Sequence, residues 1–439
     1  EYQVTTGTIL SEAGFGWGAG VWGNSRWGNS RGYKFLRLWS QVVYGQNLII
    51  GPRGGQLYMV KPLDGGFGTT AFQRATALAD EVGADSVPLG CLTISFAPAA
   101  RILVAYGANS YTGTDVDPLL VRWSDAENPF VWRPAITNQS GEYRLYGGTR
   151  IVAAAAAGRD TLILTDTNAF LMQYIGAPYV FGFSPIADNI SVASPNAMTS
   201  ANGIVYWMGM DKFYVYDGRI QTLPCPLISE VFTNFDTVQT DQVISGTNER
   251  FDEVWWFYCS VDAQQPDRYV IYNYLDKLWS YGTLTRTAWL DTPYFEGPIA
   301  FTAYGNAVVH ELGQDDVATA TTNPLNAYVE SSDFDIGDGQ NYAFVKRILP
   351  DVTFNGSTAD TPRVYVSIQG KQYPGGTLVS SPTQGVARID ASPVEQWTEA
   401  VSVRIRARQA RYRIESNELG VQWRQGVPRI DVRADGRSS

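Results

Sequence analysis

The chain has 439 residues, of which 13% are aromatic and 17% are charged, and its formal net charge is −10. Its 43 glycines, 22 prolines and 25 tyrosines are typical of short strands joined by tight turns, and the periodic runs of long amphipathic helices are missing. The acidic balance argues against charge-driven nucleic-acid binding, which needs clustered Lys and Arg. It still suits a channel wall that repels phosphate and lets DNA slide.

Glycine and tryptophan dominate residues 14–32. Trp17, Trp22 and Trp27 recur at a spacing of five, which fits neither a strand nor a helix. Glycine at this density does not hold regular structure, because each glycine loses much backbone freedom on ordering. We expect residues 1–34 to form an extended arm or loop. Its tryptophans either dock into a surface or pack on their own domain.

One pattern returns along residues 35–324: an apolar strand with an aromatic end, an Asx or Gly turn, and a second strand that carries an aromatic. Further strand candidates precede each copy, and the unit returns roughly every 40 to 60 residues, as propeller blades do. Residues 306–312 begin one further, shorter copy. We therefore expect a β-propeller of about six blades, since a β-sandwich would explain the strands but not the repeat. Clear copies are residues 119–132, 213–223 and 268–280, and weaker ones begin at 56 and 170.

The pattern changes after residue 324. Residues 363–369 and 401–408 alternate with period two, and in the second run valine and isoleucine form one face. We expect residues 325–439 to form a small antiparallel sandwich or platform with a basic end. Its alternating arginines suit paired contacts with carboxylates, so docking of a partner subunit is preferred over contact with DNA. The candidate docking residues are Trp17, Trp22 and Trp27 in the arm, and Arg404, Arg406, Arg408, Arg411 and Arg413 here.

Histidine and cysteine offer little chemistry. His310 is the single histidine, so the His-Glu pair that it begins cannot complete a zinc-protease motif. Cys91, Cys225 and Cys259 lie far apart in apolar stretches, which favours small buried hydrophobes over a disulfide framework or a metal site. This usage suits a reducing cytoplasm. No apolar run is long enough to span a bilayer, so no membrane anchor is expected. We expect no cofactor.

Paired carboxylates leave one enzymatic route open, because glycosidases need only two of them. The candidates are Asp315 with Asp316, Asp252 with Glu253, and Asp335 with Asp338. The Asp spacing in residues 333–339 also suggests a calcium loop, but no glutamate closes it. Solvated turn carboxylates are the preferred interpretation, and we expect the chain not to be an enzyme.

Several of these stretches resemble the propeller tail proteins of short-tailed bacteriophages (podoviruses), the nozzle, hub or packaged-DNA stabilisation proteins. The likeness covers about residues 115–350. It rests on residues 121–125 with Trp132, on 203–209 with 213–218, on 253–258 with 267–273, and on 330–338. The resemblance implies a homo-hexameric ring below the portal and adaptor proteins, around the channel through which DNA leaves. It carries no catalytic residues.

We therefore expect a structural virion protein of the tail, assembled in the cytoplasm of the host bacterium. Its implied partners are portal and adaptor proteins, tail fibre or needle proteins, and double-stranded DNA that passes without sequence recognition. Two alternatives remain. One is a tail-borne glycan hydrolase that uses Asp335 and Asp338, and the other is a receptor-binding propeller at the tail tip.

Overall fold

The computed structural model describes residues 36–62, 74–97, 99, 101–292, 294–303, 305–317, 321–335, 341–371, 373, 376 and 389–437. The arm with Trp17, Trp22 and Trp27 lies outside these residues. The chain forms two compact units, Glu1–His310 and Glu311–Ser439. The domain boundary predicted from the sequence, between residues 324 and 325, therefore lies later in the chain than the boundary between the two compact units, which follows His310.

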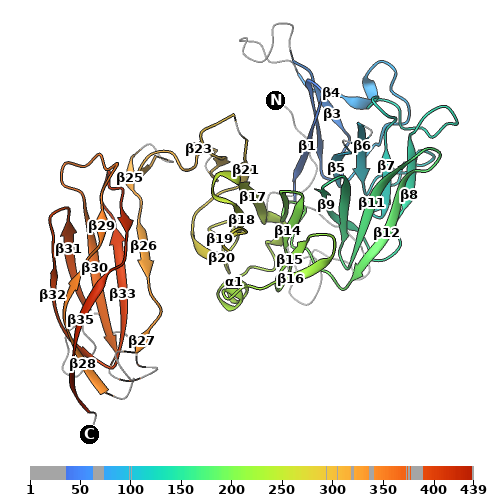
Figure 1. Ribbon diagram of the computed structural model, residues 1–439. Coiled ribbons are helices and arrows are strands. Elements are labelled where there is room, and N and C mark those ends of the chain that lie inside the picture. Colours follow the sequence, from blue (N-terminus) through green and yellow to red (C-terminus); the bar gives the residue numbers. More distant parts are fainter. Residues whose placement is uncertain are drawn as a thin grey trace, which may run out of the picture. The chain divides into compact units, whose positions relative to one another are not determined.

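The described residues of the first unit form six small antiparallel sheets in chain order, each an up-and-down meander (Figure 1). The first three sheets have four strands each. They are β1 (Trp39–Tyr44), β2 (Asn47–Pro52), β3 (Tyr58–Val60) and β4 (Thr76–Ala77); β5 (Thr93–Ala97), β6 (Ile102–Tyr106), β7 (Leu120–Trp123) and β8 (Gly141–Arg144); and β9 (Ile151–Ala157), β10 (Asp160–Thr165), β11 (Asn168–Gly176) and β12 (Val180–Asp188).

The next two sheets also have four strands, and the sixth has three. They are β13 (Met198–Ala201), β14 (Ile204–Met208), β15 (Phe213–Tyr216) and β16 (Ile220–Leu223); β17 (Ile244–Asn248), β18 (Glu253–Tyr258), β19 (Arg268–Asn273) and β20 (Leu278–Thr283); and β21 (Ala288–Leu290), β22 (Ile299–Phe301) and β23 (Ala307–Val309). The one α-helix among the described residues is α1 (Ile228–Thr233), with 3-10 turns at Leu78–Asp80, Thr240–Gln242 and Glu249–Phe251.

The first strand of each sheet contacts the first strand of the next, from β1 through β5, β9, β13 and β17 to β21. Such radial repetition of meanders is a β-propeller, and the six sheets confirm the expected blade number. An ion pair also joins the first and fifth blades, because the Arg53 guanidinium lies 2.9 Å from the Asp241 carboxylate. Arg53 is only 5% exposed, so this contact belongs to the interior of the unit.

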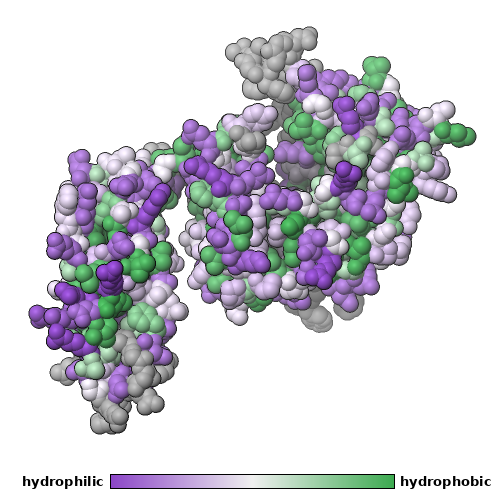
Figure 2. All heavy atoms as spheres, in the orientation of Figure 1, coloured by the Kyte–Doolittle hydropathy of each residue, from purple (hydrophilic) through white to green (hydrophobic). Residues whose placement is uncertain are grey.

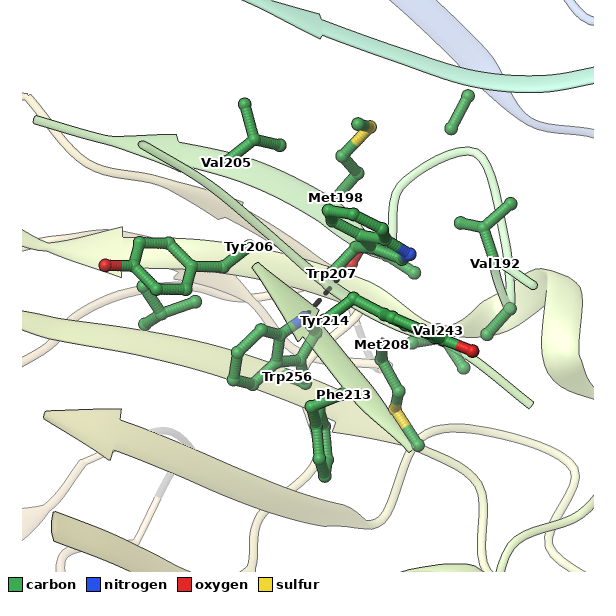
Figure 3. Packing of buried hydrophobic residues seen from close by; sticks show 14 of the residues in the cluster. Val192, Met198, Val205, Tyr206, Trp207, Met208, Phe213, Tyr214, Val243 and Trp256 are labelled. Carbon is green, nitrogen blue, oxygen red and sulfur yellow. Dashed lines mark hydrogen bonds between the residues drawn. The ribbon is translucent and has the colours of Figure 1, made fainter. Parts of the chain in front are cut away.

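The recurring aromatics fill the space between neighbouring blades. In Figure 3, Trp207 of β14, Phe213 of β15 and Trp256 of β18 pack together, with the rings of Phe213 and Trp256 at 5.0 Å. The Trp256 indole nitrogen donates to the Ala197 carbonyl at 3.0 Å, which satisfies its one polar group in the core. These aromatic side chains therefore bury apolar surface within their own blade and also pack against the neighbouring blade.

The second unit is a β-sandwich, which confirms the expected architecture. Its larger sheet has the order β26-β33-β30-β31, with β27 also on β33, and its smaller sheet has the order β32-β28-β35. Two short pairs, β24 with β25 and β29 with β34, complete it. The strands are β24 (Asp315–Asp316), β25 (Asn323–Pro324), β26 (Ala327–Glu330), β27 (Phe334–Asp335), β28 (Asn341–Leu349), β29 (Val352–Thr353), β30 (Arg363–Lys371), β31 (Ile389–Glu395), β32 (Val401–Ala407), β33 (Gln409–Ser416), β34 (Arg424–Gln425) and β35 (Arg429–Arg437).

The sandwich core is aliphatic and draws on both sheets. Val345 comes from β28, Val366 from β30, Ile405 from β32 and Ile414 from β33, and all four are buried. Alternation places these side chains inward and their neighbours outward, as period two requires. Within the described chain, no helix is long and apolar enough to cross a membrane.

Candidate functional site: the basic face of the sandwich

Strand β32 turns its arginines outward. Its residues alternate between buried and exposed, so Val401, Val403 and Ile405 face the core while Arg404 and Arg406 are exposed. The alternation predicted for residues 401–408 is therefore confirmed up to Ala407. Arg408 lies half-buried in the turn between β32 and β33.

Strand β28 carries two aromatic side chains, Tyr342 and Phe344, beside the arginines of its two neighbouring strands. The central strand β28 pairs Phe344 with Arg406 of β32 on one side and with Arg433 of β35 on the other. The Arg406 guanidinium also stacks on Tyr342, 4.2 Å from the ring centre. Side chains opposite one another in a sheet lie on the same face. Arginine and aromatic rings therefore alternate across the smaller sheet, and Figure 2 shows hydrophilic side chains over β32 and β35.

Only part of the positive charge on this face is neutralised. Arg347 pairs with Asp431 at 3.1 Å, and Arg406 with Asp435 at 2.6 Å. In the part of the chain that the structure describes, no ion pair reaches Arg404, Lys346 or Arg433, and all three are exposed. Five cations thus face two carboxylates, an excess of three positive charges. The basic face is defined here as Tyr342, Phe344, Lys346, Arg347, Arg404, Arg406 and Arg433.

Arg411 and Arg413 lie elsewhere, which corrects the idea of one set of docking arginines. They belong to β33, the next strand along the chain, but that strand is part of the larger sheet. Their side chains pair with carboxylates of their own unit. Arg411 reaches Glu330 at 2.9 Å and Asp333 at 3.0 Å, and Arg413 reaches Glu330 at 3.2 Å and Glu415 at 2.6 Å. These two guanidiniums are already satisfied within the fold.

The carboxylates that pair with Arg411 and Arg413 include Asp333, which also binds Lys371. The hydrogen bond from the Lys371 ammonium, helped by Arg411, lowers the pKa of Asp333 below its usual value. Asp333 was the first residue of the suggested calcium loop, and it is engaged with cations instead. Asp338 of that loop lies outside the described residues. Asp335 accepts a hydrogen bond from Gln409 at 2.9 Å.

Three of the other candidate carboxylates have hydrogen bonds or turn positions within their own unit. Asp315 accepts from the Gly420 amide at 2.9 Å, and Asp252 sits at φ 57° in the turn before β18. Glu253 accepts from the Trp255 indole at 2.9 Å. Asp315 and Glu253 thus each accept a structural hydrogen bond, and Asp252 occupies a turn. Among the described residues, no cluster of His, Cys, Asp and Glu could hold a metal ion.

His310 and the cysteines lie within the packing of the first unit. The Arg286 guanidinium donates from Nε to His310 Nε2 at 2.8 Å, and the imidazole packs on Trp289. Burial and Arg286 lower the pKa of His310 to about 4. Cys91 and Cys259 are buried, and burial raises the pKa of both thiols to about 12.

The aromatic part of the basic face was not predicted from the sequence. The signal was present in residues 341–347, where Ala343 and Val345 alternate with Tyr342 and Phe344. That alternation predicts a strand with one aromatic face. It could not show that β32 and β35 lie on either side of β28, because that pairing is long-range.

No family model and no curated protein matches the chain. Among solved structures, an exo-β-1,3-galactanase from Phanerochaete chrysosporium aligns at 10% identity over 96% of this chain and 100% of that one, with a TM-score of 0.28. A Synechocystis apocarotenoid oxygenase aligns at 9% identity over 60% and 66%, with a TM-score of 0.32. PorZ of Porphyromonas gingivalis aligns at 10% identity over 62% and 37%, with a TM-score of 0.28. Likenesses this distant say nothing about activity.

Proposed function

We propose that the chain is a structural subunit of a short-tailed bacteriophage tail, and that six copies form the nozzle ring around the DNA-exit channel. The observation that carries this proposal is the basic face, which holds an excess of three positive charges on a chain whose net charge is −10. Residues 311–439 contain 14 Lys and Arg against 16 Asp and Glu. Of the net charge of −10, the propeller unit therefore carries −8. The basic face is the positive surface that complements it.

Such an arrangement favours contacts between different surfaces of neighbouring copies. The basic face of one copy would meet an acidic propeller surface of the next, and this kind of interface is heterologous. Heterologous contacts close into a ring when the rotation between copies is a fraction of a full turn. Electrostatic complementarity fixes the register of such contacts and selects against wrong partners. The remaining acidic surface would leave DNA mobile in the channel.

The resemblance to nozzle proteins supports the same assignment from another direction. Its strongest stretches fall on β7, β14, β15, β18 and β19, which are blade strands with largely buried side chains. The likeness therefore concerns how the propeller is packed. Portal and adaptor proteins, tail fibres or a needle, and the packaged DNA are the partners that the resemblance implies. No cofactor and no catalysis enter this role.

Symmetry-resolved electron microscopy of the virion that carries this chain tests the proposal. We expect six copies around the DNA channel, in contact with the adaptor, with the basic face at the boundary between neighbours. Copies found only in peripheral fibres or spikes would refute the nozzle role.

A matched pair of variants tests the basic face. Arg404→Glu with Arg433→Glu reverses two unpaired charges on it, and we expect this chain to fail to enter the ring. Arg159→Glu with Arg219→Glu makes the same change of charge at two exposed propeller positions and serves as the control. Equal incorporation of both double variants would show that the basic face is not the contact.

A further inference from the structure

An aromatic groove lies between the second and third propeller blades. It has a volume of about 920 Å³ and runs between β8 and the hairpin of β11 and β12. Tyr143 of β8 stacks on Phe183 of β12, with ring centres 4.5 Å apart and planes 4° apart. Trp123 meets Phe181 edge-on at 5.3 Å in its floor. The groove is thus built by two blades, and rings line its length.

The rim of the groove is apolar and uncovered. Ile136 at the tip of one loop is 106% exposed, and Tyr179 and Ile175 at the hairpin tip are 75% and 58% exposed. Figure 2 shows hydrophobic side chains at the surface beside β8 and β12. Single exposed hydrophobic side chains are common on protein surfaces, but several that lie together mark a contact site.

The polar content of the groove is small and acidic. Glu142 is its one carboxylate, and its two oxygens accept from the Ser110 hydroxyl at 2.9 Å and the Tyr111 amide at 3.1 Å. One of these oxygens also lies 3.8 Å from Nε of the buried Arg122, which balances its charge. These bonds fix the carboxylate and leave lone pairs for a further donor. An occupant with aromatic rings and hydrogen-bond donors matches this lining.

We propose that the groove binds the glycine- and tryptophan-rich segment, residues 14–32, of a second copy of the chain. This segment carries Trp17, Trp22 and Trp27. Residues 13–35 also contain Arg26, Arg31 and Lys34 and no Asp or Glu. Tryptophan and arginine are the residues that most often dominate binding energy at interfaces. The indole and guanidinium donors of the segment match the free lone pairs of Glu142, and its indole rings match the aromatic lining.

The length of the segment limits how it binds. Five residues of extended chain span about 17 Å, so successive tryptophans are too far apart to share one position in the groove. One indole would enter the groove, and the others would contact the rim. The glycines between them leave little side chain in the way, so the backbone can follow the floor closely.

This inference rests on the proposed ring, since a second copy must lie nearby. It adds the apolar part of the contact. Ion pairs at a surface contribute little stability and weaken with salt, so a stable ring needs buried apolar area as well. The groove and the tryptophan segment are the complementary surfaces that supply it.

Photo-cross-linking in the full chain tests the pairing. A photo-reactive phenylalanine derivative replaces Tyr179, and unlabelled and ¹⁵N-labelled copies are mixed before irradiation. We expect cross-links from position 179 to residues 14–32 in pairs of mixed isotopic mass, which identify contact between copies. The same derivative at Leu275, 70% exposed on the fifth blade, is the control and should not capture that segment.

Tryptophan variants complete the test. Trp17→Ala, Trp22→Ala and Trp27→Ala together should lower the yield of the cross-link by about tenfold or more, and one of the three single changes should account for most of that loss. Cross-links within one copy only, or none to residues 14–32, would overturn the inference. A six-fold ring in the virion without the cross-link would support the nozzle role and refute the contact between the groove and residues 14–32. The cross-link in a chain found only in peripheral fibres would support that contact and refute the nozzle role.

Discussion

Arg122 shows how one residue organises a blade. Its side chain is 1% exposed, and its guanidinium donates to the carbonyls of Asn109, Ser86 and Trp132 at 2.8, 2.6 and 3.3 Å. Desolvation lowers its pKa to about 10, so it remains charged at neutral pH. Arg122 of β7 therefore holds three loop carbonyls together, and it also lies 3.8 Å from the Glu142 carboxylate of β8.

We expect Arg122→Met to destabilise the first unit by about 2–4 kcal/mol, because two buried carbonyls and one half-buried carbonyl lose their donor. Arg122→Lys keeps the charge but not the planar fork, so its loss should be intermediate. Urea unfolding followed by tryptophan fluorescence measures both. If Arg122→Lys were as stable as the unmodified chain, the fork geometry would be irrelevant.

His310 should make stability depend on pH. Its pKa is about 4 in the fold against an ordinary value near 6.5, so the unfolded chain binds the proton more tightly. The stabilisation from a neutral imidazole is then complete above about pH 6.5 and is lost as the pH falls toward 4. The effect amounts to at most about 3 kcal/mol.

His310→Gln keeps an acceptor for Arg286 but does not titrate. We expect this variant to lose less stability than the unmodified chain between pH 7 and pH 4.5. Urea midpoints at several pH values give the comparison, and the carboxylates contribute equally to both chains. Parallel pH profiles would rule out His310 as the source.

At the scale of elements, sequence patterns located strands best where aromatics and turn residues coincide. The predicted copy at 213–223 contains β15 and β16, and the predicted stretches 253–258 and 268–273 match β18 and β19. Of the sixth blade, the sequence predicted only the last strand, β23, which lies within the expected copy at residues 306–312. Its other strands, β21 and β22, have three residues each and show too few alternations to be recognised.

Gly246 illustrates a constraint between blades that no local pattern reveals. A Cβ atom there would lie 2.0 Å from the Trp289 ring, whose indole nitrogen donates to the Thr247 carbonyl at 2.8 Å. Trp289 also stacks on Trp255 with ring centres at 5.3 Å, so it has no room to move. The glycine lets the sixth blade pack on β17.

We therefore expect Gly246→Ala to cost about 1–3 kcal/mol by overpacking and to loosen the sixth blade first. Gly113→Ala is the control, since a Cβ at Gly113 would meet no atom within 4 Å. Thermal unfolding and limited proteolysis near residues 288–309 give the two readouts. Equal melting temperatures for both variants would contradict the packing argument.

For the whole molecule, the boundary between units could not be read from the change in sequence pattern. The repeat ends near residue 324, but residues before it already belong to the sandwich. Asp315 accepts from the Gly420 amide, and Gln314 accepts from the Thr358 hydroxyl at 2.8 Å. Such contacts join residues about 40 to 100 positions apart. A local pattern therefore marks where the repeat stops, and tertiary contacts decide where the second unit starts.

The two boundaries give different expectations for isolated fragments. Residues 311–439 hold a core of their own, drawn from both sheets, so we expect this fragment to fold and unfold cooperatively. Residues 325–439 lack β24 and the Asp315 contact, so the Gly420 amide loses its acceptor. We expect this shorter fragment to be less stable by about 1–3 kcal/mol, and circular dichroism during thermal unfolding measures the difference. Equal stability of the two fragments would place the start of the sandwich at 325, where the sequence pattern changes, and would make residues 311–324 a connection between the units.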